Sequence, residues 1–228
     1  AEWDDELLEV FGVPKAALPR VVASIGPFPT TRGLAPLPDG VPILSVMGDS
    51  HSELFAHGAF RPGRVKATYG TGTSVMGLVA DAGNLDPGLC LTIAWMTDKP
   101  FLASEGNIRS SGSTVQWFAD LFGLTPAEGS DLAAQTDSRG VALVPGFNGL
   151  GAPWWDAEAV GLVSGLKLDT TRPVLARAAL ESIPHQITDI LDAVMATTGS
   201  LEALYADGGA TSSDLLMQLQ ADFAGVPV

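Results

Sequence analysis

The chain has 228 residues, of which 46% are hydrophobic, so it can bury the core of one or two globular domains. Its 26 acidic residues against 12 basic ones give a formal charge of −14, which argues against a nucleic-acid-binding surface. Because no apolar run approaches the roughly 18 residues that cross a bilayer and the first residues are acidic, we expect a cytoplasmic protein without membrane contact.

The first sixty residues predict little regular structure before one strand. A short amphipathic helix is expected at residues 7–11, and the prolines between residues 26 and 40 predict loop rather than helix. The apolar run at residues 41–47 predicts a buried strand that ends just before Asp49, followed by a short helix at residues 52–59. The carboxyl end of such a strand is where open α/β sheets place reactive groups.

The middle of the chain predicts strands and one helix. Cys90 lies in an apolar strand pattern, so we expect a buried structural thiol. A polar connection is expected after Gly123, where the helix ends. The strands are expected at residues 66–69, 74–79, 89–95 and 101–104, and the helix at residues 113–122.

The last third alternates short strands with helices. Strands are expected at residues 141–144, 160–166 and 204–206. The longest helix opens with Thr170 or Thr171 as its cap and continues to about Ala196, and Ser212 or Ser213 caps the last helix. By itself this order predicts only a mixed α/β domain.

One turn stands out for its chemistry. Gly70 and Gly72 permit positive φ between two predicted strands, so successive backbone N–H groups and the hydroxyls of Thr71 and Thr73 could face one point. Such a turn could bind phosphate. An ordinary β-hairpin turn is the alternative, and it is favoured where such a motif stands alone.

The motif does not stand alone, because it is one of four segments that together resemble the FGGY family of carbohydrate kinases. Their order and spacing match that family across nearly the whole chain, and the Tyr-Gly-Thr-Gly form is similar to that of glycerol kinases and their near relatives. The four segments are Gly48-Asp49, the run from Lys66 to Gly72, the run from Gly149 to Asp156, and the run from Asp207 to Ala210.

The resemblance implies an α/β protein with an actin-like ATPase (ribonuclease H-like) fold. Residues 1–60 would be the C-terminal part of the N-terminal, sugar-binding domain. Residues 61–228 would be the C-terminal, nucleotide-binding domain, incomplete at its end. The chain would thus be truncated at both ends, and this piece alone would be inactive.

The resemblance also makes Asp49 the catalytic base that accepts the proton of the attacking hydroxyl. Capping of the following helix is the alternative for an Asp at this position. Ser50 and His51 follow where glycerol kinases carry glutamines, so a longer polyol or ketose becomes a candidate acceptor. His51 could equally be a structural histidine.

For the nucleotide, the resemblance implies phosphate contacts from the turn after the first strand, and adenosine contacts from the following helix and the last glycine turn. Packing is the alternative for Gly112 and Gly209, and a hydroxyl replaces a family Asn at Ser213. The residues implied are Gly70, Thr71, Gly72, Gly112, Gln116, Gly208, Gly209 and Ser213. Trp117, Trp154 and Trp155 are expected in core or domain-interface packing rather than in sugar stacking.

The expected activity is phosphorylation of a small sugar or polyol by ATP with Mg²⁺, in a protein that could be a homo-oligomer. No metal ligand is assigned within these residues. The alternative is a non-catalytic, nucleotide-sensing relative that acts through a protein partner. A third reading, an actin-like ATPase without a small-molecule acceptor, is disfavoured by the Gly48-Asp49 motif and by the run from Gly149 to Asp156.

Overall fold

The computed structural model describes residues 2–228, which divide into two compact units. One unit contains residues 2–48 with residues 95–100, and the other contains residues 49–94 with residues 101–228. The boundary between residues 60 and 61 is a functional assignment that this division does not test, so it stays a prediction.

The first unit begins with two short helical segments. They are the helix α1 (Asp5–Val10) and the 3₁₀ turn η1 (Lys15–Ala17). Oδ1 of Asp4 accepts a hydrogen bond from the backbone N–H of Leu7 at 2.9 Å, which caps α1. The short helix predicted here is confirmed, with an earlier start than the apolar pattern indicated.

The strand predicted at residues 41–47 is wrong. Within this run only Pro42 takes part in a β-bridge, to Thr30, and Leu44 and Val46 are exposed at 75% and 56%. An apolar run becomes a strand only where a neighbouring strand takes up its backbone hydrogen bonds. The described residues of this unit supply only isolated contacts of that kind.

The second unit is built on a five-stranded sheet with the strand order β3-β4-β2-β1-β7. β1 pairs with β2 and β2 pairs with β4 in antiparallel fashion, whereas β1 and β7 run parallel. The hairpin predicted around the glycine turn is confirmed, but neither Gly70 nor Gly72 adopts the positive φ on which the prediction was based. The strands are β1 (Arg64–Tyr69), β2 (Thr73–Val79), β3 (Cys90–Met96), β4 (Pro100–Ile108) and β7 (Ala203–Asp207).

Five helices belong to this unit, together with two short 3₁₀ turns. α5 opens where expected, with Thr171 as its N-cap residue, and it contains Pro184. The helices are α2 (Asp49–Ala56), α3 (Gly112–Phe122), α4 (Pro126–Ala133), α5 (Arg172–Thr198) and α6 (Asp214–Ala224), and the turns are η2 (Ala82–Asn84) and η3 (Gly209–Ser212).

Helix α4 was missed, because its sequence reads as a polar connection. The side chain of Thr125 accepts from the backbone N–H of Glu128, and the Glu128 carboxylate accepts from the backbone N–H of Thr125. This capping box and Pro126 in the first turn stabilise a helix start without an apolar stripe. The Thr-x-x-Glu spacing was the available signal.

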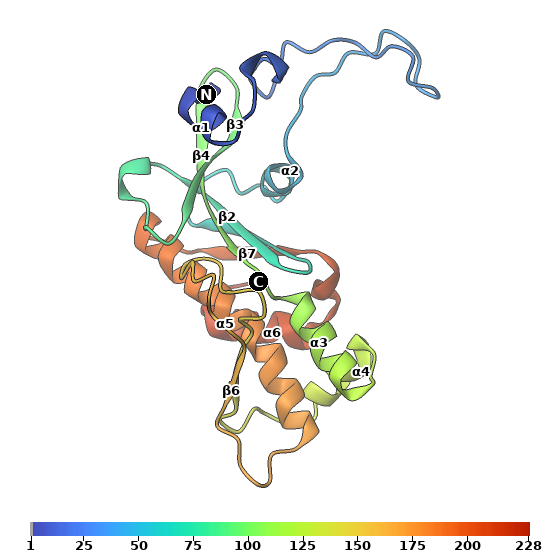
Figure 1. Ribbon diagram of the computed structural model, residues 1–228, viewed down its shortest axis with the longest axis vertical. Helices are drawn as coiled ribbons and strands as arrows, with labels where there is room; N and C mark the ends of the chain where they lie inside the picture. The colour runs from blue at the N-terminus through green and yellow to red at the C-terminus, as the bar shows by residue number, and fades with distance from the viewer. Residues whose placement is uncertain (1) are drawn as a thin grey trace. The chain divides into compact units, whose positions relative to one another are not determined.

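The two faces of the sheet are covered differently, as Figure 1 shows. α5 and α6 lie along one face and α2 lies against the other. The main core forms on the α5 side, where alternate residues of β1 meet the long helix. Its fully buried members include Val65, Ala67, Tyr69, Ile183, Ile187, Ile190 and Leu204.

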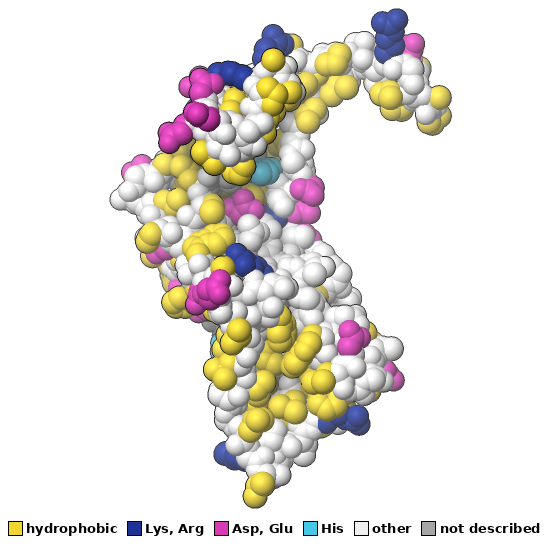
Figure 2. All heavy atoms as spheres, in the orientation of Figure 1, with side chains coloured by type: hydrophobic (Ala, Val, Ile, Leu, Met, Phe, Trp, Pro, Cys, Tyr) yellow, Lys and Arg dark blue, Asp and Glu magenta, His cyan; other side chains and the backbone are white. Residues whose placement is uncertain are grey.

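A small antiparallel ribbon, β5 (Ala142–Val144) with β6 (Leu162–Ser164), completes the second unit. Apolar side chains gather over this region on the face drawn in Figure 2. Exposed members near the ribbon are Val144, Val160, Leu162 and Leu166.

The burial predicted for Cys90 is wrong, and so is the core placement of Trp154 and Trp155, whereas packing of these tryptophans at a domain interface stays a prediction. Cys90 is exposed, because β3 is one of the two edge strands of the five-stranded sheet and its outer side meets solvent. Trp154 and Trp155 are exposed at 62% and 44%, so they do not belong to the core. Their indole N–H groups donate to a carboxylate of Asp189 at 3.2 Å and to the carbonyl of Gly88 at 2.8 Å, respectively.

Candidate functional site

Two glycine turns come together at one edge of the sheet. β1 ends at Tyr69 and the parallel β7 ends at Asp207. Because the carboxyl ends of parallel strands meet at the same edge, the turns at residues 70–72 and 208–209 become neighbours despite their separation in sequence. This edge is where open α/β sheets bind ligands.

A cleft of about 830 Å³ opens at this edge, a size that suits a small-molecule ligand. The turn after β1, the start of α3 and the turn after β7 form its walls. Five of the residues predicted to bind nucleotide line it: Gly70, Thr71, Gly112, Gln116 and Gly209. The remaining lining residues are Tyr69, Ser113, Trp117, Asp120, Leu121 and Ala210.

The turn after β1 is docked on the start of α3. The backbone N–H of Gly112 donates to the carbonyl of Gly70 at 3.0 Å, and Ser113 donates to the carbonyl of Thr71 through its N–H at 3.2 Å and its hydroxyl at 3.1 Å. A Cβ on Gly112 would stand 2.6 Å from the Gly70 oxygen. Close packing therefore requires glycine at this position, and the docking fixes the turn at the cleft.

Gly209 behaves differently from the other glycines of the site. A Cβ built on it would meet no atom within 4 Å, so packing does not explain it. Gly208 has a φ of +92° and packs against the backbone of Tyr69, so the turn itself requires glycine there. Gly72 packs against the carbonyl of Ile108. Gly72 and Gly208 support the turns and do not line the cleft.

Gln116 has a partner that was not anticipated from the sequence. Its Nε2 donates to Oδ1 of Asp120 at 2.7 Å. An ionised carboxylate only accepts hydrogen bonds, so the amide nitrogen must face Asp120 and Oε1 of Gln116 stays available as an acceptor. The spacing of four residues on a predicted helix was the signal for this pair. Beside it, Trp117 packs on Phe147 with ring centroids 4.7 Å apart, as the packing interpretation expected.

Ser213 lies outside the cleft lining. Its hydroxyl accepts a hydrogen bond from the backbone N–H of Leu216 at 3.3 Å, which confirms it as the cap of α6. A contact between this hydroxyl and a nucleotide stays a prediction.

The acceptor-side residues lie at the start of α2. Asp49 is exposed, and its Oδ1 accepts from the backbone N–H of Ser50 at 2.8 Å, so it satisfies one amide of the first helical turn. The residue stays exposed to solvent despite this contact. His51 is half-buried, with Nε2 3.3 Å from Oγ1 of Thr92, as a structural histidine would be.

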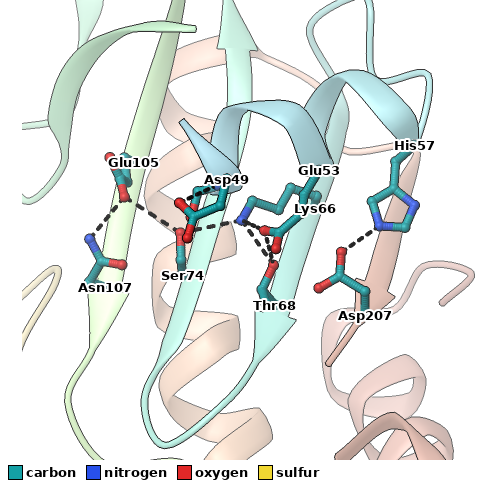
Figure 3. Close-up of polar contacts among 10 residues, drawn as sticks. Asp49, Glu53, His57, Lys66, Thr68, Ser74, Glu105, Asn107 and Asp207 are labelled. Atoms are coloured by element: carbon teal, nitrogen blue, oxygen red, sulfur yellow. Dashed lines mark hydrogen bonds and ion pairs between the residues drawn. The ribbon is translucent and has the colours of Figure 1, made fainter. Parts of the chain in front are cut away.

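The face of the sheet beneath α2 carries an ion pair between a buried lysine and a partly exposed glutamate (Figure 3). Lys66 of β1 is fully buried, and its Nζ lies 2.9 Å from Oε2 of Glu53 and 2.9 Å from Oγ1 of Thr68. The Thr68 hydroxyl in turn donates to Oε2 of Glu53 at 2.7 Å. The sequence contained one signal for this pair, a lysine within an otherwise uncharged strand.

A second contact joins the end of α2 to β7. Nε2 of His57 lies 2.6 Å from Oδ2 of Asp207, and the two side chains are 26% and 27% exposed. Oδ1 of Asp207 is buried and has no hydrogen-bond partner among the described residues. The contact therefore places His57 directly before the Gly208 turn.

The described part of the chain has neither a grouped set of metal ligands nor a membrane-spanning helix. Within residues 2–228 no three His, Cys, Asp or Glu side chains are grouped as a metal site requires. In the same part of the chain, no helix has the length and apolar character needed to cross a membrane.

Comparison with known sequences gives a consistent result. The C-terminal domain model of the FGGY family of carbohydrate kinases matches residues 65–228. An apulose kinase of Pectobacterium atrosepticum is 40% identical over 99% of this chain and 47% of its own length. A glycerol kinase of Mycobacterium tuberculosis is 40% identical over 100% of this chain and 46% of its own length. The chain spans about half the length of the curated relatives it matches.

Solved structures agree with the sequence comparisons. A Plasmodium falciparum glycerol kinase with ADP superposes with a TM-score of 0.84 and 29% identity, covering 99% of this chain and 46% of that protein. A ligand-bound xylulose kinase from Lactobacillus acidophilus gives a TM-score of 0.82 at 24% identity, covering 99% of this chain and 47% of that protein. The second similarity concerns the fold alone.

Proposed function

Because this chain belongs to the FGGY family of carbohydrate kinases and has their actin-like ATPase fold, we propose that its protein transfers the γ-phosphoryl group of ATP to a hydroxyl of a sugar or polyol. One observation carries the proposal. Residues from three separate parts of the chain, predicted to bind nucleotide, line a single open cleft at the carboxyl ends of β1 and β7. We place the reaction in the cytoplasm.

The cleft suits a nucleotide for identifiable reasons. The turn at residues 70–72 is held rigidly on α3, so its backbone can approach phosphate groups without rearrangement. Gly209 leaves open space where a side chain would project. The free acceptor oxygen of Gln116 suits a hydroxyl or amino group of the nucleoside. A relative of this fold was solved with ADP.

Asp49 supplies the base in this proposal. Phosphoryl transfer requires positioning and charge stabilisation, together with an acceptor for the proton of the attacking hydroxyl. Asp49 presents an exposed carboxylate at the first turn of α2, and Ser50 and His51 follow it. The contact of His51 with Thr92 favours a supporting role for this histidine over direct sugar contact.

Mg²⁺ accompanies ATP in phosphoryl transfer and would neutralise phosphate charge. The described residues do not fit a magnesium site of their own, because they contain no cluster of three ligating side chains. We therefore derive no step through the metal from these residues.

The acceptor belongs to the class of sugars and polyols. Relatives at 40% identity are named as glycerol and apulose kinases, so more than one acceptor occurs among them. We propose an acceptor longer than glycerol, because Ser50 and His51 stand where glycerol kinases carry glutamines.

The test is ADP release by the full-length native protein against glycerol, tetritols, pentuloses, hexuloses and aldonates. We expect one class of acceptor to stimulate release, and Asp49→Asn to lower the stimulated kcat by about 10²–10⁴-fold, as loss of a general base does. ADP binding should be unchanged in this variant. ATP binding without stimulation by any acceptor would instead favour a nucleotide-sensing protein that acts through a protein partner.

A second test examines the cleft itself. Gly209→Ala adds a methyl group in open space, so it should leave the urea midpoint unchanged and weaken ADP binding, measured by calorimetry. Gly112→Ala is the contrasting variant, because its methyl group would collide with the Gly70 carbonyl and lower stability as well. Unchanged ADP affinity in Gly209→Ala would contradict the placement of the nucleotide over this turn.

A further inference from the structure

Three ionisable side chains follow one another at intervals of four residues along α2 and just beyond its end: Asp49, Glu53 and His57. This spacing places them on one side of a helix. The backbone N–H of His57 donates to the carbonyl of Glu53 at 3.0 Å, so the helical turn continues to His57. Since Glu53 and His57 both contact strands, this side of α2 faces the sheet (Figure 3).

The sheet offers α2 a row of polar residues. Thr68 of β1 is in register with Asp207 of β7 and with Ser74 of β2, and Ser74 is in register with Asn107 of β4. Residues in register across a sheet share a face, and Lys66 lies two positions before Thr68 on the same face. α2 has a single fully buried apolar residue, Leu54. The polar contacts of Glu53 and His57 are therefore part of what attaches this helix to the sheet.

Lys66 is the centre of this attachment. Its ammonium group has three protons and three acceptors, with Ser74 Oγ at 3.5 Å completing the set formed by Glu53 and Thr68. A buried ion pair adds little net stability compared with apolar side chains of the same volume, because desolvation offsets the attraction. It does favour one arrangement of its partners, since any other leaves a buried charge unpaired.

We propose that Lys66 is a positioning residue for phosphoryl transfer, which with Glu53 and Thr68 fixes one orientation of α2 on the sheet and thereby holds Asp49 in place. This inference rests on the proposed function, because it takes Asp49 as the base. Asp49 lies one helical turn before Glu53, about 6 Å along the axis, so a shift at Glu53 is passed on to Asp49. A displacement of about 1 Å at a reacting group can cost about 10²-fold in rate.

The first variant is Lys66→Met in the full-length native protein, since methionine fills a similar volume without charge. We expect kcat to fall about 10²-fold, with the KM for ATP and the Kd for ADP changed less than about threefold. The matched control is Arg177→Met on α5, which breaks a mostly buried ion pair away from α2, with Glu181 at 2.6 Å. It should lower the urea midpoint similarly and leave kcat within about threefold.

A pair of substitutions at Glu53 separates positioning from mere structural support. Glu53→Gln keeps an oxygen acceptor for Lys66 and Thr68 but leaves the buried ammonium without a counter-charge, so kcat should fall, although less than in Glu53→Leu. Glu53→Leu removes the acceptor and should reproduce the loss of Lys66→Met. Because Glu53 is about one-third exposed, these variants keep the proposal testable even where Lys66→Met does not fold.

A readout independent of activity is amide hydrogen exchange in α2. Exchange at residues 50–56 should accelerate at least tenfold in Glu53→Leu and Lys66→Met, but not in Arg177→Met. Unchanged kcat in folded Lys66→Met, equal losses in Lys66→Met and Arg177→Met, or unchanged exchange in α2 would each overturn the inference. A wild-type protein that turns over no acceptor refutes the proposed kinase function, while α2 exchange still decides whether Lys66 fixes the helix.

Discussion

The two faces of β1 carry opposite chemistry. Val65, Ala67 and Tyr69 point into the apolar core that includes α5 and α6. Lys66 and Thr68, on the alternate positions, form ionic and hydroxyl contacts beneath α2. One strand of six residues thus supplies both the main core and the support of the candidate base.

The two faces differ in the interactions that attach their helices to the sheet. α5 has many buried apolar residues, and apolar burial is strong but tolerant of small shifts in position. α2 has few apolar contacts, and its hydrogen bonds and ion pairs depend on distance and angle. We therefore expect substitutions on the α5 face to change stability first, and substitutions on the α2 face to change catalysis first.

The largest expected effect on stability is on the apolar face. Ile187→Ala removes a fully buried side chain of α5 and should lower the free energy of unfolding by about 2–5 kcal/mol, through lost burial and a residual cavity. Urea denaturation measures it. Leu168→Ala is the control, because Leu168 is fully exposed and its loss should matter by less than about 0.5 kcal/mol. Similar losses in both would contradict the assignment of the main core to this face.

The next largest expected effect on stability comes from a buried hydrogen bond within the apolar face. The hydroxyl of Tyr69 donates to Oε1 of Gln220 at 2.9 Å, and Gln220 is fully buried. Tyr69→Phe should cost about 1–3 kcal/mol, because it leaves that oxygen without a partner. Combining it with Gln220→Leu should recover part of the loss, as a double-mutant cycle in urea would show. Strict additivity of the two losses would mean that this hydrogen bond is not formed.

The cap of α6 should matter less. Ser213→Ala removes the acceptor for the Leu216 N–H and should cost about 1 kcal/mol in thermal or urea unfolding. Ser213→Asn is the matched variant, since asparagine is an equally good cap. Measuring ADP affinity for both reports whether this position also contacts the nucleotide. A destabilised asparagine variant would contradict the capping role.

The smallest expected effect is on the pH dependence of stability and concerns one carboxylate of α5. Burial raises the pKa of Asp189 on α5 above its usual value, and the charge of Asp192 raises it further. The folded protein then binds more protons than the unfolded chain just above pH 4, so this group makes stability fall as pH rises through that window. Asp189→Asn should flatten this part of the stability curve, measured by urea midpoints from pH 4 to 6. An unaltered slope would contradict the shifted pKa.

Much of the second unit was predictable from the sequence, because its signals are local. The glycine turn of β1–β2, the length of α5, the cap at Ser213 and the turn at Gly208 each depend on a few neighbouring residues. The candidate site followed from motif order, and five of its nucleotide residues do line one cleft. α4 was missed because polar capping without an apolar stripe resembles a loop.

Predictions from the local sequence pattern failed where strand formation or burial depends on a neighbouring strand. The apolar run at residues 41–47 lacks a neighbouring strand, and Cys90 lies on the edge strand, so neither has the burial that its composition indicates. The hydropathy of a segment does not show whether it becomes an edge strand or whether another strand pairs with it.

The sequence by itself determined most elements of the second unit, with α4 as the exception, because propensity, capping and turn composition act within a few residues. Only the tertiary structure decided that Glu53 meets Lys66 and that His57 meets Asp207. Side chains separated by 13 and 150 positions become neighbours only when strand order and register place their strands beneath one helix.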